Sequence, residues 1–260
     1  MGTRKTLMGM GMAAVCALAA CSSPANFRGP ATPAAAPPSA AVDGPCHSLG
    51  EGLVAFETGD AERVTFAIAD RYQETKVVLT SCVQVPGGYV QEWEATGFTG
   101  SAGFGRSGDV LVDSLETPTG SYTVTEAFGR KDPGTALEYH ELNEFSRWGG
   151  RPGEHHNRYF EGRGAWPDEN LWELMEIGLY EQAAVINYNR LPDMEPEPGL
   201  SYAIFLHAGM SESWGCLSTD LAIVTRFLKT AVPGDRIVMG VNREVFLDAS
   251  SALVDPDTEQ

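Results

Sequence analysis

The sequence predicts a mainly β domain with two helices, and three observations support this fold class. Residues that favour strands, chiefly valine, threonine, isoleucine and the aromatic residues, gather in short runs separated by turn residues. Two further stretches instead repeat their apolar residues at helical intervals. The chain has 260 residues, of which 43% are hydrophobic and 20% charged, and this is enough for one sizeable core.

The predicted strands begin at residue 63. They are the runs 63–69, 75–85, 89–96, 108–114, 120–128, 183–189, 202–207 and 236–241. The sequence VPGGY at 85–89 predicts a hairpin between the second run and the third. Sequences rich in proline, glycine and acidic residues separate most of the other runs: 117–120, 131–135, 195–199 and 232–235. This succession of short runs is typical of a domain built mainly of strands.

The first predicted helix covers residues 168–182. Its aliphatic residues recur at roughly helical intervals: Leu171, Leu174, Ile177 and Leu179. The polar and aromatic segment before it, 129–167, shows no regular period. A long irregular stretch inside a compact domain is often a binding loop or a lid, so we expect one of these here.

The second predicted helix covers residues 218–230. Ser218 or Thr219 is suited to cap its start, because a hydroxyl can accept hydrogen bonds from free backbone N–H groups. Asp220 in the first turn and Lys229 in the last have the charges that the helix dipole favours. These signals place the helix directly after Cys216.

The first 20 residues are similar to an export signal. Arg4 and Lys5 precede an apolar run, 7–20, that ends at Cys21 and is too short to span a bilayer as a helix. The sequence LAAC at this point looks like a bacterial lipobox, in which the cysteine receives a diacylglyceryl group before cleavage. We therefore expect a lipoprotein signal peptide at 1–20 and a lipid anchor on Cys21. A plain secretory signal cleaved near Ala20 is the alternative.

Residues 21–45 should form a tether between that anchor and the domain. The segment 22–45 is rich in proline, alanine and serine, and it has too little apolar mass to build a core.

The formal net charge of the whole chain is −17, with a pI near 4.6. A nucleic-acid partner needs a basic surface, so this charge argues against one, and it also argues against adsorption to an anionic bilayer. We expect the domain to lie outside the cell membrane.

Three cysteines fall after Cys21, and their positions suggest a partition. Cys46 and Cys82 both lie in the N-terminal third, whereas Cys216 stands alone far downstream. In an oxidising compartment an odd number leaves one thiol free. The simplest pairing is therefore a Cys46–Cys82 disulfide with a free Cys216.

Three features suggest that Cys216 is a nucleophile. The predicted helix start at 218–230 would stabilise a thiolate through the positive end of its dipole. Gly215 permits a tight turn, so that its N–H and that of Cys216 could form an oxyanion hole. His207 ends a predicted strand nine residues upstream, close enough along the chain to act as a base. A buried cysteine and a satisfied histidine would explain these residues equally well.

Four sequence elements resemble those of the L,D-transpeptidase (YkuD-type) catalytic domain. They are TPTGSYTVTEAFG at 117–129, AAVINYN at 183–189, IFLH at 204–207 and GCLS at 215–218, in the order seen in that family. The resemblance spans about residues 61–241. It implies an L,D-transpeptidase-like β-sandwich as the catalytic domain, which we place at 46–241, followed by a C-terminal tail at 242–260.

The resemblance also implies roles for individual residues. Cys216 matches the nucleophile of the family, and His207 matches the histidine that activates it. The third partner in the family is generally a backbone carbonyl, here that of Ala208. The family typically has Ser/Thr-His-Gly-Cys-x-Asn at the nucleophile, so Trp214 replaces a histidine and Ser218 an asparagine. By the resemblance, Cys216 and His207 form a thiolate–imidazolium pair with a depressed cysteine pKa.

Five residues are candidates for substrate binding: Ser213, Trp214, Ser218, Tyr188 and Asn189. Tyr188 and Asn189 match a family position near the cleft, although capping of a strand end would also explain them. Trp214 could be an aromatic wall of the cleft or a packing residue. His155 and His156 are adjacent and point apart on one element, so they make a poor metal pair. We expect neither a metal nor another cofactor.

The activity implied by the resemblance is peptidoglycan L,D-transpeptidation. The acyl donor would be a tetrapeptide stem that loses its terminal D-alanine, and an amine of a second stem would accept the acyl group, giving a 3-3 cross-link. The expected partners are peptidoglycan stem peptides and the membrane through Cys21, and we expect a monomer. Two alternatives remain: a non-catalytic peptidoglycan-binding lipoprotein, and an L,D-carboxypeptidase on the same scaffold.

Overall fold

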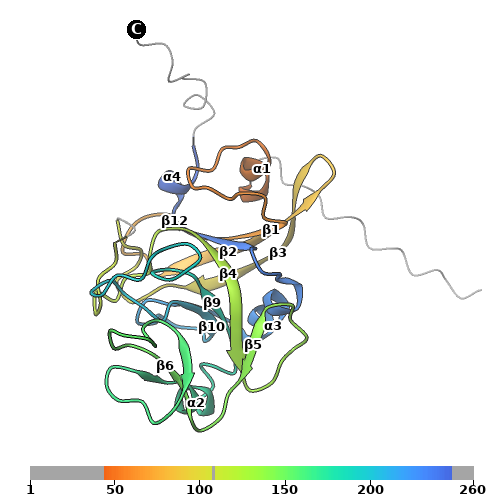
Figure 1. The fold of residues 1–260 in the computed structure, drawn as a ribbon. Coiled ribbons are helices and arrows are strands. Elements are labelled where there is room, and N and C mark those ends of the chain that lie inside the picture. The colour runs from red at the N-terminus through yellow and green to blue at the C-terminus, as the bar shows by residue number, and fades with distance from the viewer. Residues whose placement is uncertain (1–43, 107–108, 248–260) are drawn as a thin grey trace, which may run out of the picture. The chain divides into compact units, whose positions relative to one another are not determined.

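A nine-stranded sheet forms most of the fold in the computed structural model, which describes residues 44–106 and 109–247 (Figure 1). Its strands are β1 (Arg63–Ala69), β2 (Lys76–Val85), β3 (Gly88–Phe98), β4 (Gly120–Gly129), β5 (Glu138–Glu141), β9 (Gln182–Ile186), β10 (Phe205–Ala208), β11 (Leu217–Thr219) and β12 (Arg236–Val241). The predicted signal peptide and Cys21 lie outside the described residues. The mainly β fold class is confirmed.

The sheet closes on itself. The strand order is β12-β1-β2-β3-β11-β10-β9-β4-β5, and β12 also pairs with β4, with Ile237 opposite Tyr122. Every strand of the sheet except β5 therefore has a neighbouring strand on both sides. Closure thus leaves few unpaired backbone N–H and C=O groups at strand edges. Strands β10 and β11, whose connection carries the candidate cysteine, lie next to each other in this ring.

Both faces of β1 are buried, and its alternating side chains divide between two apolar clusters. Val64, Phe66 and Ile68 belong to an outer cluster, whereas Ala67 and Ala69 belong to the main core. Side chains of a strand alternate in direction, so the run of apolar residues is what a strand covered on both faces requires.

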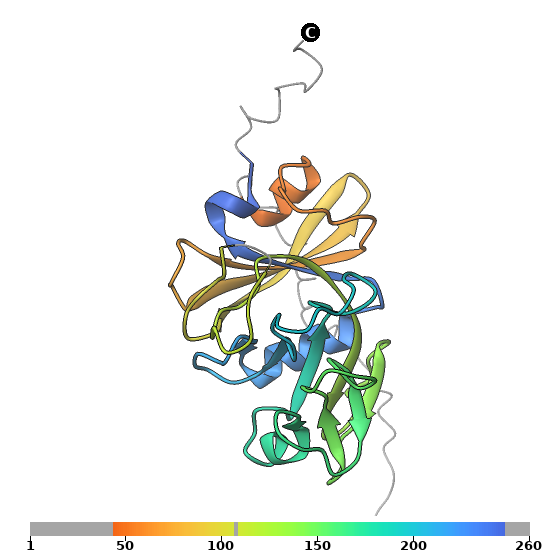
Figure 2. The ribbon, with the colours of Figure 1, turned by 60° about the vertical axis from the view of Figure 1, so that its left-hand side comes forward.

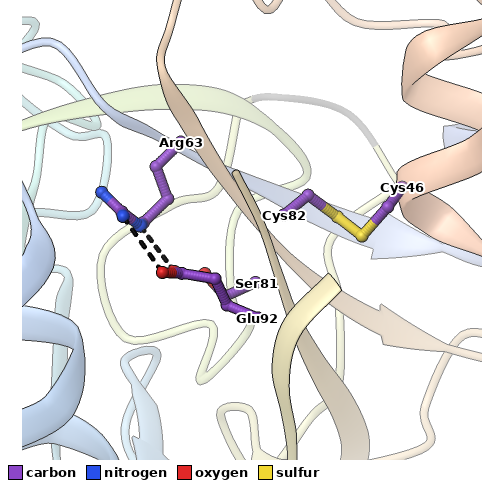
Figure 3. Close-up of a disulfide and its surroundings, with 5 residues drawn as sticks. All are labelled: Cys46, Arg63, Ser81, Cys82 and Glu92. Atoms are coloured by element: carbon purple, nitrogen blue, oxygen red, sulfur yellow. Dashed lines mark hydrogen bonds and ion pairs between the residues drawn. A yellow bond between two sulfur atoms is a disulfide. The ribbon is translucent and has the colours of Figure 1, made fainter. Parts of the chain in front are cut away.

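Two short helices and a disulfide cover the outer cluster. Helix α1 (Pro45–Gly50) and helix α4 (Asn242–Val245) lie on one side of the sheet, and α3 (Leu221–Thr230) lies on the other (Figure 2). Cys46 of α1 is joined to Cys82 of β2, the pairing favoured by the sequence (Figure 3). Close to this bond, the Arg63 guanidinium pairs with the Glu92 carboxylate at 2.8 Å. The N-terminal helix is thus covalently attached to the sheet.

Helix α3 fills the inner side of the sheet. Val224, Phe227 and Leu228 recur at helical spacing and are all buried in the main core. The helix begins at Leu221, after the cap residue Asp220, whose carboxylate accepts a hydrogen bond from Ala222 N at 2.8 Å. The predicted start at 218 is therefore wrong, because residues 217–219 pair as β11 with two neighbouring strands.

The segment 129–167 is neither a simple loop nor a lid. It contains β5 and most of a second, three-stranded sheet made of β6 (Ser146–Trp148), β7 (Tyr159–Glu161) and β8 (Glu169–Asn170). Trp148 is fully buried, and its ring packs edge-on against that of Phe205 at 4.9 Å. With helix α2 (Leu171–Glu176), this sheet builds a second apolar cluster that also contains Cys216.

Three other boundaries differ from the expectations. Within 109–114 there is one isolated bridge, Leu111 to Leu200, and no strand. Helix α2 ends at Glu176, well before residue 182, and Gly178 follows with a φ of 90° that favours glycine. The predicted tail from residue 242 begins as helix α4, in which Val245 is fully buried. The described residues therefore hold four helices, two more than predicted.

Candidate active site

Two parallel strands bring His207 and Cys216 together. Leu206 lies opposite Leu217 in the register of β10 and β11, so Cys216, directly before β11, lies beside Phe205. Alternation then directs Cys216, Phe205 and His207 to the same face of the sheet. The loop 209–216 that connects these strands is shorter than the dozen or so residues that a parallel pair usually needs. The pairing of strands, rather than proximity along the chain, therefore sets the separation of the two residues.

His207 and Cys216 both line a cavity of about 360 Å³. Its walls come from the end of β10, the loop 209–216 and the region around α2. Its lining includes Glu169, Tyr180, Trp214, His207 and Cys216. A volume of this size is at the lower end of the range that small-molecule sites span.

The His207 imidazole is held by the backbone. Its Nδ1 lies 2.7 Å from the carbonyl oxygen of Ala208, so Nδ1 donates and Nε2 remains as the basic nitrogen. The Tyr180 ring packs edge-on against the imidazole, with ring centres 5.3 Å apart. Burial lowers the pKa of His207, and the backbone groups of Ala208 and Leu179 partly oppose this. The imidazole is therefore neutral near pH 7 and able to accept a proton.

The Cys216 thiol forms hydrogen bonds with the backbone of Ala203 and Phe205, and none with the His207 side chain. Its Sγ donates to the carbonyl oxygen of Ala203 at 3.1 Å and accepts from Phe205 N at 3.4 Å. Burial raises the pKa of Cys216, and the negative charge of Glu169 adds to the effect. The expectation of a thiolate–imidazolium pair is therefore wrong for the structure described, because its Cys216 is a protonated, neutral thiol.

The helix dipole does not explain the reactivity expected of Cys216. The sequence placed the cysteine directly before a helix, but strand β11 lies between Cys216 and α3. The free N–H groups at the start of α3 are also partly satisfied by the Asp220 side chain. The effect of a helix terminus is confined to its first turn, so α3 contributes little at the thiol.

The loop 209–216 is held in place by two serine hydroxyls. Ser213 Oγ donates to the Cys216 carbonyl oxygen at 2.6 Å and accepts from Gly215 N at 3.1 Å. Ser218 Oγ donates to the Ser211 carbonyl oxygen at 2.6 Å. Ser213 and Ser218 therefore stabilise the short crossover, and both also line the cavity, so their role in substrate binding stays a prediction. Their hydroxyls are already used inside the protein.

Gly215 adopts the tight-turn conformation expected of it, but its backbone N–H is not free to donate a hydrogen bond to a ligand. Its φ of 140° is one that side-chain-bearing residues rarely adopt, and a Cβ would lie 3.1 Å from Glu116 O. Its N–H, predicted to be part of an oxyanion hole, is bonded to the Ser213 hydroxyl. The tight turn is thus present, whereas this half of the predicted oxyanion hole is occupied.

The structure separates the remaining substrate-binding candidates. Trp214 is 86% exposed on the rim of the cavity, so it is a wall residue and does not pack in the core. Tyr188 and Asn189 are fully buried, and their selection for substrate binding is wrong. The Tyr188 hydroxyl exchanges hydrogen bonds with the backbone of Val110, and Asn189 binds the backbone at 197–201.

Sequence reasoning missed a buried hub at Asn157. Its side-chain oxygen accepts from Trp148 Nε1 at 2.9 Å and from Ala203 N at 3.0 Å. Its amide nitrogen donates to the carbonyl oxygens of Tyr188 and Asn189. The hub therefore fixes Ala203, which has a φ of 56° and whose carbonyl holds the Cys216 thiol. No local sequence signal marks such a role.

Sequence reasoning also missed Glu169, a half-buried residue that lines the same cavity. The Tyr180 hydroxyl donates to its carboxylate at 2.9 Å, and Tyr180 in turn packs on His207. Burial raises the pKa of Glu169 to about 7. A thiol, an imidazole and a carboxyl group that ionises near neutral pH thus line one cavity.

The adjacent histidines point in different directions, as expected for neighbours on one segment. The His155 ring stacks on Phe160 at 4.6 Å, whereas His156 is buried against Tyr202. Within the described ranges, no three His, Cys, Asp or Glu residues are grouped closely enough to hold a metal. None of the helices between residues 44 and 247 has the length and apolar character needed to cross a bilayer.

The chain matches no protein-family model and no curated protein. Among solved structures it is similar to Bd1075 of Bdellovibrio bacteriovorus, with 14% sequence identity and a TM-score of 0.41. The match covers 76% of this chain and 55% of that one, so the chain spans about half the length of the Bdellovibrio protein. A likeness at this level assigns neither family nor activity.

Proposed function

We propose that this chain is a peptidoglycan L,D-transpeptidase, a cysteine acyltransferase with the β-sandwich catalytic domain of that family. One observation carries the proposal: His207 of β10 and Cys216, which directly precedes the adjacent parallel strand β11, line one cavity, and the Ala208 carbonyl fixes the imidazole through Nδ1. A structural cysteine needs neither an oriented histidine nor a cavity. The sequence elements at 117–129 and 215–218, which resemble that family, supply the substrate class.

The reaction would begin when the Cys216 thiol turns away from the Ala203 carbonyl and transfers its proton to His207 Nε2. The sulfur then attacks the peptide carbonyl between the diamino acid and the terminal D-alanine of a tetrapeptide stem. The C–N bond breaks, His207 returns the proton to the leaving amine, and a thioester remains. An amine of a second stem attacks the thioester, His207 accepts the amine proton as the C–S bond breaks, and His207 passes this proton to the leaving sulfur, which restores the thiol.

The wider biology follows from the sequence and is also proposed. Lipid attachment at Cys21 and the linker 21–45 would hold the domain outside the cell membrane, facing the cell wall. The partners would then be stem peptides and the membrane, with no nucleic acid, because the formal net charge is −17. The protein would act as a monomer without a cofactor.

The test is a reaction of the purified protein with a disaccharide-tetrapeptide, with products read by mass spectrometry. A cross-linked dimer that has lost one alanine, absent with Cys216→Ala and with His207→Gln, is the expected result. His155→Gln serves as the control, because that ring stacks on Phe160 outside the cavity. A tripeptide without any dimer would instead identify an L,D-carboxypeptidase.

A second candidate function is peptide binding without turnover. The observation that favours it is the resting state of the site, in which Cys216 is bonded to Ala203 and the Gly215 N–H is bonded to Ser213. Equal affinity of the parent protein and Cys216→Ala for the tetrapeptide, without any product, would support this function. A carbapenem adduct on Cys216 that depends on His207 would exclude it, because a binder has no need to activate the thiol.

A further inference from the structure

Glu169 is an acidic group without a cationic partner in the part of the chain that the structure describes. Its one side-chain hydrogen bond there is with the Tyr180 hydroxyl, at 2.9 Å. The ion pairs of the described residues use other carboxylates, for example that of Glu92, which pairs with Arg63. A carboxylate that is partly removed from water is costly unless a positive charge or several donors compensate it. The cavity at Glu169 therefore favours a cationic ligand group.

The position of Glu169 links this group to the nucleophile. Glu169 and Cys216 line the same cavity of about 360 Å³, and the negative charge of Glu169 disfavours the thiolate. A cation placed beside Glu169 would cancel that charge, and the thiolate would become easier to form. The structure thus couples occupation of one part of the cavity to the reactivity of another.

We propose that Glu169 is the subsite for a protonated amine of the substrate, and that occupation of this subsite activates Cys216. The proposal deepens the proposed function and rests on it for the source of the amine. The residue whose carbonyl Cys216 would attack is a diamino acid, and its side chain carries an amine one side-chain length from that carbonyl. An ammonium beside Glu169 would have two effects at once: it would orient the substrate, and it would favour formation of the Cys216 thiolate.

The other titratable groups that line the cavity are less suited than Glu169 to bind an ammonium group. Tyr180 donates to Glu169 and Tyr202 donates to the Pro167 carbonyl, so neither hydroxyl needs a cation. His207 donates to Ala208. Glu212 also lines the cavity but is exposed on the loop 209–216, where water compensates its charge. Glu212 is therefore a matched control: it has the same charge, lines the same cavity and lies in a solvated position.

The test uses charged thiol reagents and does not require turnover. Full-length protein would be treated at about pH 8, where Glu169 is mostly ionised because its pKa is about 7. The reagents are aminoethyl methanethiosulfonate, which is cationic, and neutral methyl methanethiosulfonate. Modification is followed by mass spectrometry of the peptide that contains Cys216. Rates are normalised to those of a small free thiol, which removes the intrinsic difference between the reagents.

The expected result is a preference of roughly fivefold to tenfold for the cationic reagent in the parent protein. Glu169→Gln should reduce this preference to about one, and it should also speed modification by the neutral reagent, because the opposing charge is gone. Glu212→Gln should leave the preference unchanged. Tyr180→Phe keeps the carboxylate but removes a hydrogen bond that lowers its pKa, so it should reduce the preference at about pH 8 and restore it at higher pH. It serves as the second variant if Glu169→Gln fails to fold, and a preference that does not change with pH in this variant would count against Glu169.

Two outcomes would overturn the proposal. The first is a preference in the parent protein that Glu169→Gln leaves intact, and the second is a preference that Glu212→Gln removes, since the general field of an acidic protein would then be its cause. If the preference behaves as expected but no tetrapeptide is consumed, the subsite stands and the proposed transpeptidase activity fails. With turnover, acetylation of the diamino acid amine should raise KM in the parent protein and leave that of Glu169→Gln nearly unchanged.

Discussion

The Cys216 thiol donates its hydrogen bond to the Ala203 carbonyl oxygen, 3.1 Å away, and no hydrogen bond joins it to His207 in the described structure. A carbonyl acceptor requires the protonated sulfur, so this contact and the raised pKa of Cys216 agree. The thiol is therefore in a protonated form that reacts slowly as a nucleophile. The proposed reaction would require a rotation of the thiol toward His207, within a cavity that both side chains line.

Cys216 should react slowly with iodoacetamide at neutral pH. Alkylation requires the thiolate, and a raised pKa reduces the thiolate fraction, so the rate should be at least tenfold below that of a small free thiol. The rate should rise roughly tenfold per pH unit between about pH 7 and pH 9. Mass spectrometry of the Cys216 peptide measures this rate. Fast alkylation that is already constant at about pH 6 would show a resting thiolate instead.

His207 should be neutral at about pH 7 in the resting protein. Burial lowers its pKa from the ordinary value of 6.5, so the charged form should appear only on further acidification. NMR titration of the imidazole Cε1–H signal measures the midpoint, with His207→Gln to identify the signal. A midpoint above 7 would mean that a negative partner, such as the Cys216 thiolate, stabilises the charged ring.

Asn157→Ala should destabilise the protein by about 3–5 kcal/mol, because several buried partners would lose their hydrogen bonds. Urea denaturation gives the change in free energy of unfolding. Asn170→Ala is the comparison, since it removes only the cap of α2 and its bond to Arg147, and caps are worth about 1 kcal/mol. Equal losses in the two variants would argue against a hub at Asn157.

Removal of the Cys46–Cys82 disulfide should cost about 3–4 kcal/mol of stability. The bond closes a loop with a sequence separation of 36 residues, and a cross-link of this length restricts the unfolded chain by roughly this amount. Chemical denaturation of the variant Cys46→Ala/Cys82→Ala gives the value. Alkylation of Cys216 in the folded variant should be unchanged, because the bond lies in the outer cluster and the thiol in the second one. A loss below about 1 kcal/mol would contradict the prediction.

The sequence predicts the long strands best. The runs 63–69 and 236–241 match β1 and β12 residue for residue, because both are covered on two faces and are apolar apart from Arg63, Thr65 and Arg236. The run 108–114 has a Val-Leu-Val centre between aspartates but forms no strand in its described part, where Leu111 is 60% exposed. Residue composition indicates what can pair, whereas the presence of a neighbouring strand decides whether it does.

The chemistry of the site was partly predictable for a similar reason. His207 and Cys216 are recognisable because the pair of residue types, a strand end and a nearby glycine occur together. The ionisation state of the thiol was not, because it depends on burial and on Glu169, which follows a segment without regular pattern. The structural role of Ser213 and Ser218 was not predictable either, because the hydrogen bonds of their hydroxyls depend on how the short parallel crossover folds.

That crossover has a mechanical consequence. Trp214 stands on the rim, yet it lies between Ser213 and Gly215, which are tied by hydrogen bonds to the Cys216 backbone and to each other. The loop is also anchored to a second segment, since Ser213 N donates to the Thr99 carbonyl oxygen at 2.9 Å. A ligand that moves the Trp214 backbone would therefore also move the residue that bears the sulfur. We expect contact at the mouth of the cavity to be transmitted to Cys216 through the backbone of this loop.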